Sequence, residues 1–159
     1  MKTALVVRPF RIGDEAALHG VFYSAIREVA SRDYTSEQIA AWAPVEWDRT
    51  AWADRIRQIR PHVVEIGAEL VGYADVQPNG YMDHFFVAAA WARKGVGRAL
   101  MDRVHSTAFD LGVKLLWSDV SRTAQPFFSR FGFRIVRESS AVIRGVTVPN
   151  AHMEKYLEG

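Results

Sequence analysis

The hydrophobic positions of the chain change their period near residue 61. Before it they recur every three or four residues, which is the spacing of one face of a helix. The first such face consists of Leu18, Val21, Phe22, Ala25 and Ile26. It predicts a helix that begins after Asp14, whose carboxylate can cap the first turn, and that runs to about Val29.

Two further helices are predicted before the change of period. Thr35 and Gln38 fit a capping box, in which a side chain and a backbone amide at each end of the first turn bond one another. Asp48 can cap the next helix, which runs to about Ile59. The aligned apolar residues of that helix are Trp52, Ile56 and Ile59.

Beyond residue 61 the pattern is that of strands. Three apolar stretches, residues 62–66, 70–76 and 81–87, are separated by turn-forming residues at 67–69 and 78–80. Because such short turns join neighbouring strands, these stretches predict an antiparallel meander.

The other predicted elements complete the fold class. They are a strand at 4–8, a helix from Gly95 to Gly112 with Val96, Leu100, Val104 and Leu111 on its apolar face, a strand at 114–120, a helix at 124–130, a strand at 133–140, and a last strand at 146–148 and 152–157 with an interruption at Pro149 and Asn150. This order predicts an α/β (α+β) fold with a mixed, mostly antiparallel central sheet flanked by helices. A length of 159 residues predicts a single domain over residues 1–159.

Composition and charge reduce the number of function classes that fit the chain. A net charge of +2 gives no broad field for nucleic acid, and the basic stretch 93–103 is broken by Asp102. The absence of cysteine excludes disulfides, a thiol nucleophile and a cysteine metal site. No apolar run approaches the length of a membrane span and the first residues lack a signal-peptide pattern. We therefore expect a cytoplasmic protein that binds no metal, no nucleic acid and no membrane.

The start of the predicted helix at Gly95 is a candidate anion site. The first amides of a helix have no internal partner, and glycines such as Gly95 and Gly97 let a ligand approach the backbone closely. Arg93, Lys94 and Arg98 add positive charge. The alternative is an ordinary helix start with basic side chains in solvent. The stretch is neither a P-loop nor a dinucleotide fingerprint.

Residues 92–97, Ala-Arg-Lys-Gly-Val-Gly, resemble the acetyl-CoA loop of the GNAT superfamily of N-acetyltransferases, which has Gln or Arg, two residues, Gly, one residue, then Gly or Ala. The glycines match, and Ala92 stands where Gln or Arg is usual. Residues 121–133 resemble a later family segment, Asn-x-x-Ala-x-x-Phe-Tyr-x-x-x-Gly-Phe. There Ser121 replaces the Asn and Phe128 replaces the Tyr. The order of the predicted elements also resembles that of the family.

This resemblance implies acetyl-CoA as co-substrate. Backbone amides of the glycine loop would hold the CoA pyrophosphate, and the strand at 81–87 would pair with the pantetheine arm, with Phe86, Val87 and Ala88 as candidates for backbone contact. The implied cofactor-binding residues are Phe85, Phe86, Val87, Arg93, Lys94, Gly95, Val96, Gly97, Arg98, Ser121 and Phe128. The tyrosine replaced by Phe128 can protonate the departing thiolate in the family, so this chain must release CoA without that donor, use water, or use another group.

The resemblance implies an acid or a histidine on the strand at 81–87, at the position of Tyr81 or Asp83. We prefer Asp83 as the general base, acting directly or through a water, with His84 as the alternative. In a regular strand, Tyr81 and Asp83 point to one face and His84 to the other. An unperturbed histidine has a pKa suited to a base, but the alternation turns His84 away from the expected site. The alternative to a catalytic role is a solvated Asp83 and a packed His84.

The acceptor is predicted to lie among the early helices. Tyr34, Trp42 and Tyr81 are the candidate substrate contacts, and Trp47 and Trp52 could extend an aromatic wall. Core packing explains Trp42 and Trp52 at least as well. The sequence thus predicts an N-acetyltransferase that acts on a primary amine of a small molecule or a protein. The alternative is a non-catalytic acyl-CoA sensor, and the resemblance leaves a homodimer open.

Overall fold

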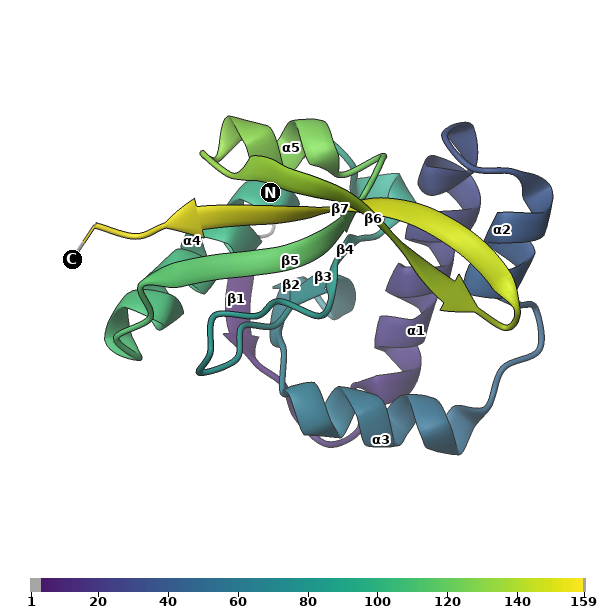
Figure 1. Ribbon diagram of the computed structural model, residues 1–159. Coiled ribbons are helices and arrows are strands. Elements are labelled where there is room, and N and C mark those ends of the chain that lie inside the picture. The colour runs from purple at the N-terminus through teal and green to yellow at the C-terminus, as the bar shows by residue number, and fades with distance from the viewer. Residues whose placement is uncertain (1–3, 159) are drawn as a thin grey trace.

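The computed structural model describes residues 4–158 as two sheets with helices packed around them (Figure 1). The strands are β1 (Leu5–Pro9), β2 (His62–Ile66), β3 (Glu69–Ala74), β4 (Phe85–Val87), β5 (Leu115–Ser121), β6 (Arg134–Ile143) and β7 (Val146–Tyr156). The helices are α1 (Glu15–Ser24), α2 (Ser36–Trp42), α3 (Arg49–Ile59), α4 (Val96–Asp110) and α5 (Gln125–Arg130). A π-helical turn, Ala25–Val29, continues α1, and 3-10 turns lie at Ala30–Arg32 and Ala89–Trp91.

The predicted meander is present. Strands β1 to β4 form one antiparallel sheet in that order, and a second antiparallel sheet has the order β5-β7-β6. Within the described residues the two sheets are joined by one isolated parallel bridge between Tyr81 and Trp117, where the Met82 amide donates to the Trp117 carbonyl at 3.0 Å. The predicted fold class is confirmed, with the central sheet divided into two parts that separate after Met82.

The helix starts follow the predicted chemistry in two cases of three. Thr35 and Gln38 make the capping box, and the Asp48 carboxylate accepts from the Ala51 amide at 2.9 Å. Asp14 precedes α1 but does not cap it. Its carboxylate is instead paired with the buried guanidinium of Arg8, 2.8 Å away.

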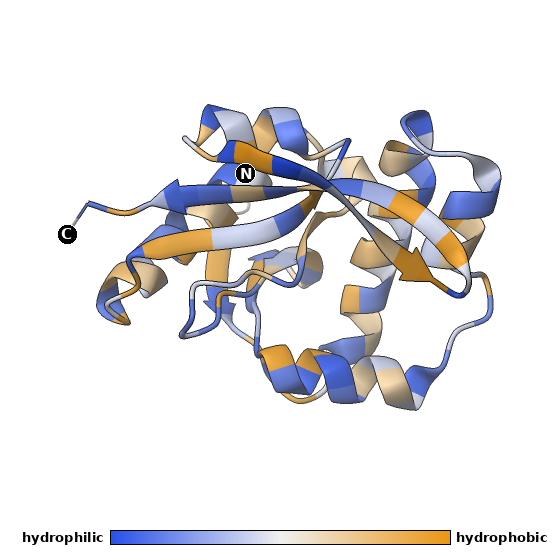
Figure 2. Ribbon diagram, in the orientation of Figure 1, coloured by the Kyte–Doolittle hydropathy of each residue, from blue (hydrophilic) through white to orange (hydrophobic). Residues whose placement is uncertain are grey.

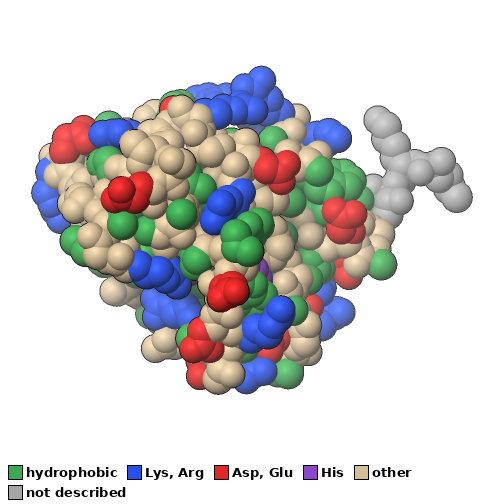
Figure 3. Space-filling model, turned by 90° about the vertical axis from the view of Figure 1, so that its right-hand side faces the viewer, with side chains coloured by type: hydrophobic (Ala, Val, Ile, Leu, Met, Phe, Trp, Pro, Cys, Tyr) green, Lys and Arg blue, Asp and Glu red, His purple; other side chains and the backbone are tan. Residues whose placement is uncertain are grey.

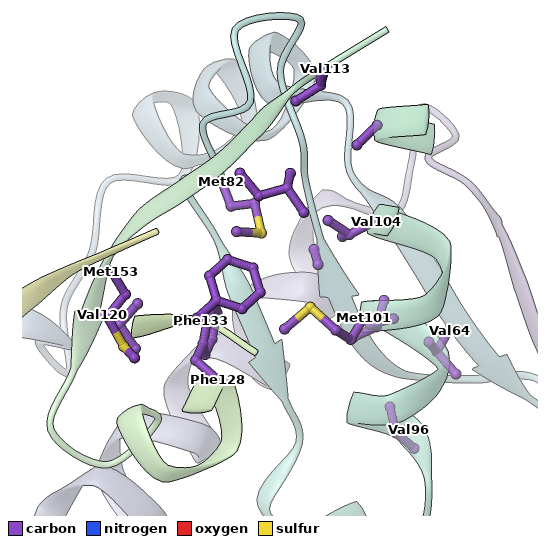
Figure 4. Packing of buried hydrophobic residues seen from close by; sticks show 14 of the residues in the cluster. Val64, Met82, Val96, Met101, Val104, Val113, Val120, Phe128, Phe133 and Met153 are labelled. Carbon is purple, nitrogen blue, oxygen red and sulfur yellow. The ribbon is translucent and has the colours of Figure 1, made fainter. Parts of the chain in front are cut away.

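Helix α4 packs against the first sheet and carries the larger core. Its apolar face contacts β3 at Gly72, where an added Cβ would come within 2.7 Å of Val96 Cγ1. Met101 and Val104 pack with Met82, Phe128 and the residues of β5 and β7 around them (Figure 4). Leu111 was expected on this face, but it follows the last residue of the helix and is half exposed. Helices α1 to α3 cover the other face of the first sheet and form a second core.

The β6–β7 hairpin extends beyond the end of β5. Its two turn residues, Arg144 and Gly145, both have positive φ, as a two-residue hairpin turn requires. The strand residues next to the turn are hydrophobic (Figure 2), and this end of the hairpin lies beside α2. The predicted interruption at Pro149 is wrong, because β5 ends opposite Asn150 and Pro149 has only β6 as a neighbour, a position where strands accept proline.

Helix length and surface charge are relevant to the expectation that the protein binds neither membrane nor nucleic acid. Within residues 4–158 no helix has the length and apolarity required to cross a bilayer. On the face that carries the hairpin tip, acidic and basic side chains are interspersed (Figure 3).

Candidate active site

A cavity of about 310 Å³ opens where the two sheets separate. Helices α1 and α2, the residues before β4, the end of β5, α5 and the β6–β7 hairpin supply its walls. The cavity gathers these sequence-predicted site residues: Tyr34, Trp42, Tyr81, Asp83, His84, Phe85, Phe86, Ser121 and Phe128. Residues from position 34 to position 128 of the chain therefore face one space.

The predicted strand at 81–87 is regular only in its last three residues. Residues 80–82 bond to β5 instead, and the carboxylate of Asp75 then accepts from the amides of Asp83, at 2.9 Å, and His84, at 2.6 Å. Asp75 is completely buried, and burial raises its pKa to about 6. The Asp75 amide also donates to the His84 carbonyl at 3.1 Å, so the pairing with β3 extends to His84, although the predicted alternation placed only Asp83 at the site. Both residues line the cavity.

Asp83 is held from two sides. Arg55 of α3 donates to Oδ2 with its Nε at 3.0 Å, and the Tyr81 hydroxyl donates to Oδ1 at 3.1 Å. Desolvation and the neighbouring carboxylates raise the pKa of Tyr81, so its hydroxyl remains protonated. The Asp83 carboxylate is thus a fixed negative group at the cavity wall.

His84 lies next to it in a buried position. Its Nε2 is 3.5 Å from Asp83 Oδ2, and its Nδ1 is 2.9 Å from the hydroxyl of Tyr73. Burial lowers the pKa of His84 to about 4, with Asp83 opposing and Arg55 reinforcing that shift. Tyr73 is fully buried, which raises its pKa well above the usual value. At neutral pH the imidazole is therefore uncharged and the phenol protonated.

The aromatic wall is shorter than expected. Trp42 lines the cavity, with its ring edge-on to Tyr34 at 5.5 Å. Trp47 instead stacks on His19, 3.5 Å between ring centres, and Trp52 donates its indole N–H to the Glu15 carbonyl. Neither Trp47 nor Trp52 lines the cavity.

Tyr34 has a structural role in addition to lining the cavity. Its hydroxyl donates to the Pro149 carbonyl at 2.6 Å and accepts from the Arg122 amide at 2.9 Å. These two bonds connect the helices to β7 and to the residue that follows β5. The hydroxyl is therefore occupied, and only the ring of Tyr34 is free to contact a ligand.

The glycine loop lies at the other end of β4. Gly95, with φ of 86°, is the N-cap of α4, and Arg93 also has a positive φ of 61°. The first helical bond runs from the Ala99 amide to the Gly95 carbonyl, which leaves the amides of residues 96–98 outside the helical pattern. The side chains of Arg93, Lys94 and Arg98 are exposed, whereas that of Val96 is buried in the core. Val96 can therefore offer a ligand only its backbone.

The register of β4 corrects the expected backbone contacts. Phe86 is opposite Tyr73, and the Ala88 amide donates to the Val71 carbonyl at 2.9 Å. In an antiparallel pair the backbone groups of alternate residues point to the partner strand, so Phe86 and Ala88 are used by β3. The groups of Phe85 and Val87 point to the open edge. Gly97 lies close to this edge, with an added Cβ 3.8 Å from Val87 Cγ2.

Three residues that the sequence did not single out organise the site: Arg55, Tyr73 and Asp75 contact Asp83 or His84 directly. A carboxylate that directly follows the apolar stretch 71–74 was the available signal for Asp75. There was no such signal for Arg55 or Tyr73, because an arginine on a helix and a tyrosine in a strand are both ordinary. Among residues 4–158 no group of three or more histidine, aspartate or glutamate side chains could hold a metal ion.

The chain is similar to known proteins in sequence and in fold. Residues 30–157 match a family model described as an acetyltransferase (GNAT) domain. The chain is 32% identical over 147 residues to the uncharacterized N-acetyltransferase YafP of Escherichia coli (strain K12), covering 92% of this chain and 93% of the relative.

Solved structures have the same fold. A crystal structure described as a GCN5-related N-acetyltransferase from Rhodopseudomonas palustris aligns with a TM-score of 0.92 at 25% identity, over 99% of this chain and 98% of the other. YncA of Salmonella typhimurium, a putative acetyltransferase solved with acetyl-CoA, aligns with a TM-score of 0.71 at 18% identity, over 99% and 96% of the two chains.

Proposed function

The chain belongs to the GNAT family of acetyltransferases, and on that premise we propose that it moves the acetyl group of acetyl-CoA directly to a primary amine of a small molecule. The nitrogen bonds to the carbonyl carbon, the bond from that carbon to sulfur breaks, and CoA leaves as a thiolate. The nitrogen loses one proton and the thiolate gains one, which yields an amide and free CoA. The reaction needs an oriented thioester, a donor for the developing oxyanion and a proton acceptor.

The observation that carries the proposal is the position of β4. Its open edge runs from the Asp83–His84 pair in the cavity to the free amides at the start of α4. Three extended residues span roughly 10 Å, so an extended arm along this edge connects the two ends. The pyrophosphate would bind the amides of Val96, Gly97 and Arg98, with the side chains of Arg93 and Lys94 adding charge.

The open backbone groups of β4 assign the remaining contacts. Phe85 and Val87 would pair with the pantetheine arm, and the Phe85 amide, which is the open amide next to the Asp83–His84 pair, would donate to the thioester oxygen as it becomes an oxyanion. Ser121 and Phe128 would close the arm from the side of α5, since both line the cavity next to Phe85.

Asp83 would accept the proton from nitrogen as the C–N bond forms, when that proton is most acidic. The ion pair with Arg55 and the bond from Tyr81 fix the carboxylate, and the neutral His84 beside it is the alternative acceptor. Phe128 cannot protonate the leaving thiolate, so solvent would do so. A thiol with a pKa near 8.5 costs only about 2 kcal/mol to release as thiolate at pH 7.

We extend the proposal to the whole chain as one acyl-CoA N-acyltransferase-like domain, residues 1–159, that acts in the cytoplasm without a metal. The chemistry supports the last point, because the chain's own amides and carboxylate supply the oxyanion donor and the proton acceptor. The cavity volume supports a small-molecule acceptor, since it lies at the lower end of the range for such sites.

Two measurements on the full chain test the proposal. Calorimetry should detect acetyl-CoA binding, and a thiol-reactive dye should detect release of CoA when a panel of primary amines is added. Binding with no release across the panel would favour the acyl-CoA sensor, and failure to bind acetyl-CoA would reject both functions.

A further inference from the structure

The acceptor end of the cavity contains hydrogen-bond acceptors and negative charge but no positive side chain. Asp83 and Asp119 are its charged lining residues, and no lysine or arginine lines it within the described part of the chain. The Oδ1 atom of Asn150, also in the lining, is buried and receives no hydrogen bond from the described residues. Arg55 stands behind the wall and is engaged by Asp83 and Gln58.

The hydroxyl donors in the wall are mostly in use. Tyr34 donates to the Pro149 carbonyl, Tyr81 to Asp83, and Ser118 to the Met82 carbonyl. An anionic group placed here would therefore meet carboxylates and engaged donors, at the cost of its hydration. A positively charged or hydrogen-donating group would meet the carboxylates of Asp83 and Asp119, which already have Arg55 and His152 as neighbours, and the unused Oδ1 of Asn150.

The rest of the wall is apolar. Trp42, Phe22 and Phe86 form one side, and Ile143 and Val148 of the hairpin also line the space. Phe22 and Phe86 are edge-on to one another at 5.1 Å, and Trp42 is edge-on to Phe86 at 6.4 Å. Such a surface suits a compact ring or branched chain.

From this lining we infer the acceptor class, on the premise of the proposed function: a primary amine on a compact aromatic or aliphatic body that carries no carboxylate, phosphate or other anionic group. Its nitrogen lies at the Tyr81–Asp83–Asp119 end and its body lies against Trp42 and the hairpin. The inference excludes free α-amino acids, whose carboxylate would sit next to the reacting nitrogen and hence next to Asp83.

A matched set of amines tests the class. 2-Phenylethylamine and phenylalanine share the ring and the amine and differ by one carboxylate, and phenylalaninol replaces that carboxylate with a neutral hydroxymethyl group. We expect kcat/KM for 2-phenylethylamine to exceed that for phenylalanine by roughly 100-fold or more, because like charges in an interface are strongly unfavourable. Phenylalaninol should recover most of the difference. Equal or better use of phenylalanine would overturn the inference.

Binding separates this inference from the proposed function. Calorimetry on the CoA-bound protein measures affinity for the same three compounds without turnover. Binding of 2-phenylethylamine in preference to phenylalanine with no CoA release from acetyl-CoA would support the ligand class and reject the transferase. Release of CoA with phenylalanine but not with 2-phenylethylamine would support the transferase and reject the ligand class.

A charge variant tests the proposed end of the cavity. Asp119→Asn removes one of the two carboxylates, so the preference for 2-phenylethylamine over phenylalanine should shrink several-fold while the affinity for CoA stays the same. Asp102→Asn removes the same charge from the exposed face of α4 and should leave the preference unchanged. An unchanged preference in Asp119→Asn would remove Asp119 from the site.

Discussion

The guanidinium of Arg55 donates to Oδ2 of Asp83 with its Nε at 3.0 Å, across 28 positions of sequence. The pair fixes the orientation of the carboxylate and joins α3 to the cavity wall. A carboxylate held in one orientation is positioned to accept a proton from a bound ligand.

Asp83→Asn should therefore lower kcat by about 10²- to 10⁴-fold and leave the affinity for CoA unchanged. The amide retains the shape of the carboxylate but cannot take the proton. Steady-state kinetics and calorimetry of CoA binding measure the two effects. If His84→Gln shows the large loss and Asp83→Asn does not, His84 is the base and Asp83 only holds the amine.

Gly95→Glu should abolish CoA binding and leave the fold intact. The new carboxylate would occupy the approach of the pyrophosphate at the start of α4. Gly95 has a φ of 86°, so any side chain adds strain there, and Gly95→Ala is the matched control. No atom of another residue lies within 4 Å of an added Cβ, so the control measures that strain alone. Calorimetry should show full loss in the first variant and near-normal affinity in the second, and unchanged affinity in both would refute the site.

Phe128→Tyr should fold normally and raise turnover modestly. Phe128 is almost fully buried among Phe85, Phe127 and Phe133, but it also lines the cavity, so a hydroxyl on its ring can face the departing sulfur. Thermal unfolding and kcat measure the two expectations. A fall in melting temperature of many degrees would mean that the hydroxyl is buried without a partner and not directed at the cavity.

The pH dependence of stability should reveal two opposed titrations. The folded-state pKa of Asp75 is raised to about 6, so the folded protein binds this proton more tightly than the unfolded chain does. The free energy of unfolding then falls as pH rises from about 4 to 6. The pKa of His84 is lowered to about 4, so its contribution is lost as pH falls from 6.5 to 4.

Each shift corresponds to roughly 3 kcal/mol, and the two oppose one another in nearly the same window. His84→Gln should thus gain stability relative to the wild type on acidification from pH 7 to 4, and Asp75→Asn should lose it. Urea unfolding at pH 7, 5.5 and 4 measures these differences. Parallel pH curves for the wild type and both variants would contradict the opposed pair.

The order of the elements was predictable because it depends on local signals. The capping box at Thr35, the cap at Asp48 and the glycine before α4 act within one helical turn, and the structure has all three. Asp14 was predicted to act locally, but the guanidinium of Arg8 offers its carboxylate a charged partner, which is a stronger bond than a backbone amide gives.

The geometry of the candidate site was less predictable, because it depends on contacts between distant residues. The alternation of residues 81–87 fits one regular strand, but the amides of residues 83 and 84 bond the buried carboxylate of Asp75, a contact that the sequence pattern does not show. The register of β4 on β3 decides which residues of β4 have backbone groups free for a ligand, and the sequence does not show that register. Whether Trp47 lines the cavity depends on the position of its loop, which places the indole on His19 instead.

The β6–β7 hairpin extends past β5, and as a result the CoA half and the acceptor half of the site lie on different elements and can change independently in evolution. The residues that would hold CoA lie between β4 and the start of α4, whereas Ile143 and Val148, which would contact the acceptor, lie on a hairpin tip that no strand of the meander supports. Substitutions at the tip can reshape the acceptor space without altering a hydrogen bond of the glycine loop. A lineage built on this plan can therefore exchange one amine for another in small steps and keep the same acetyl donor throughout.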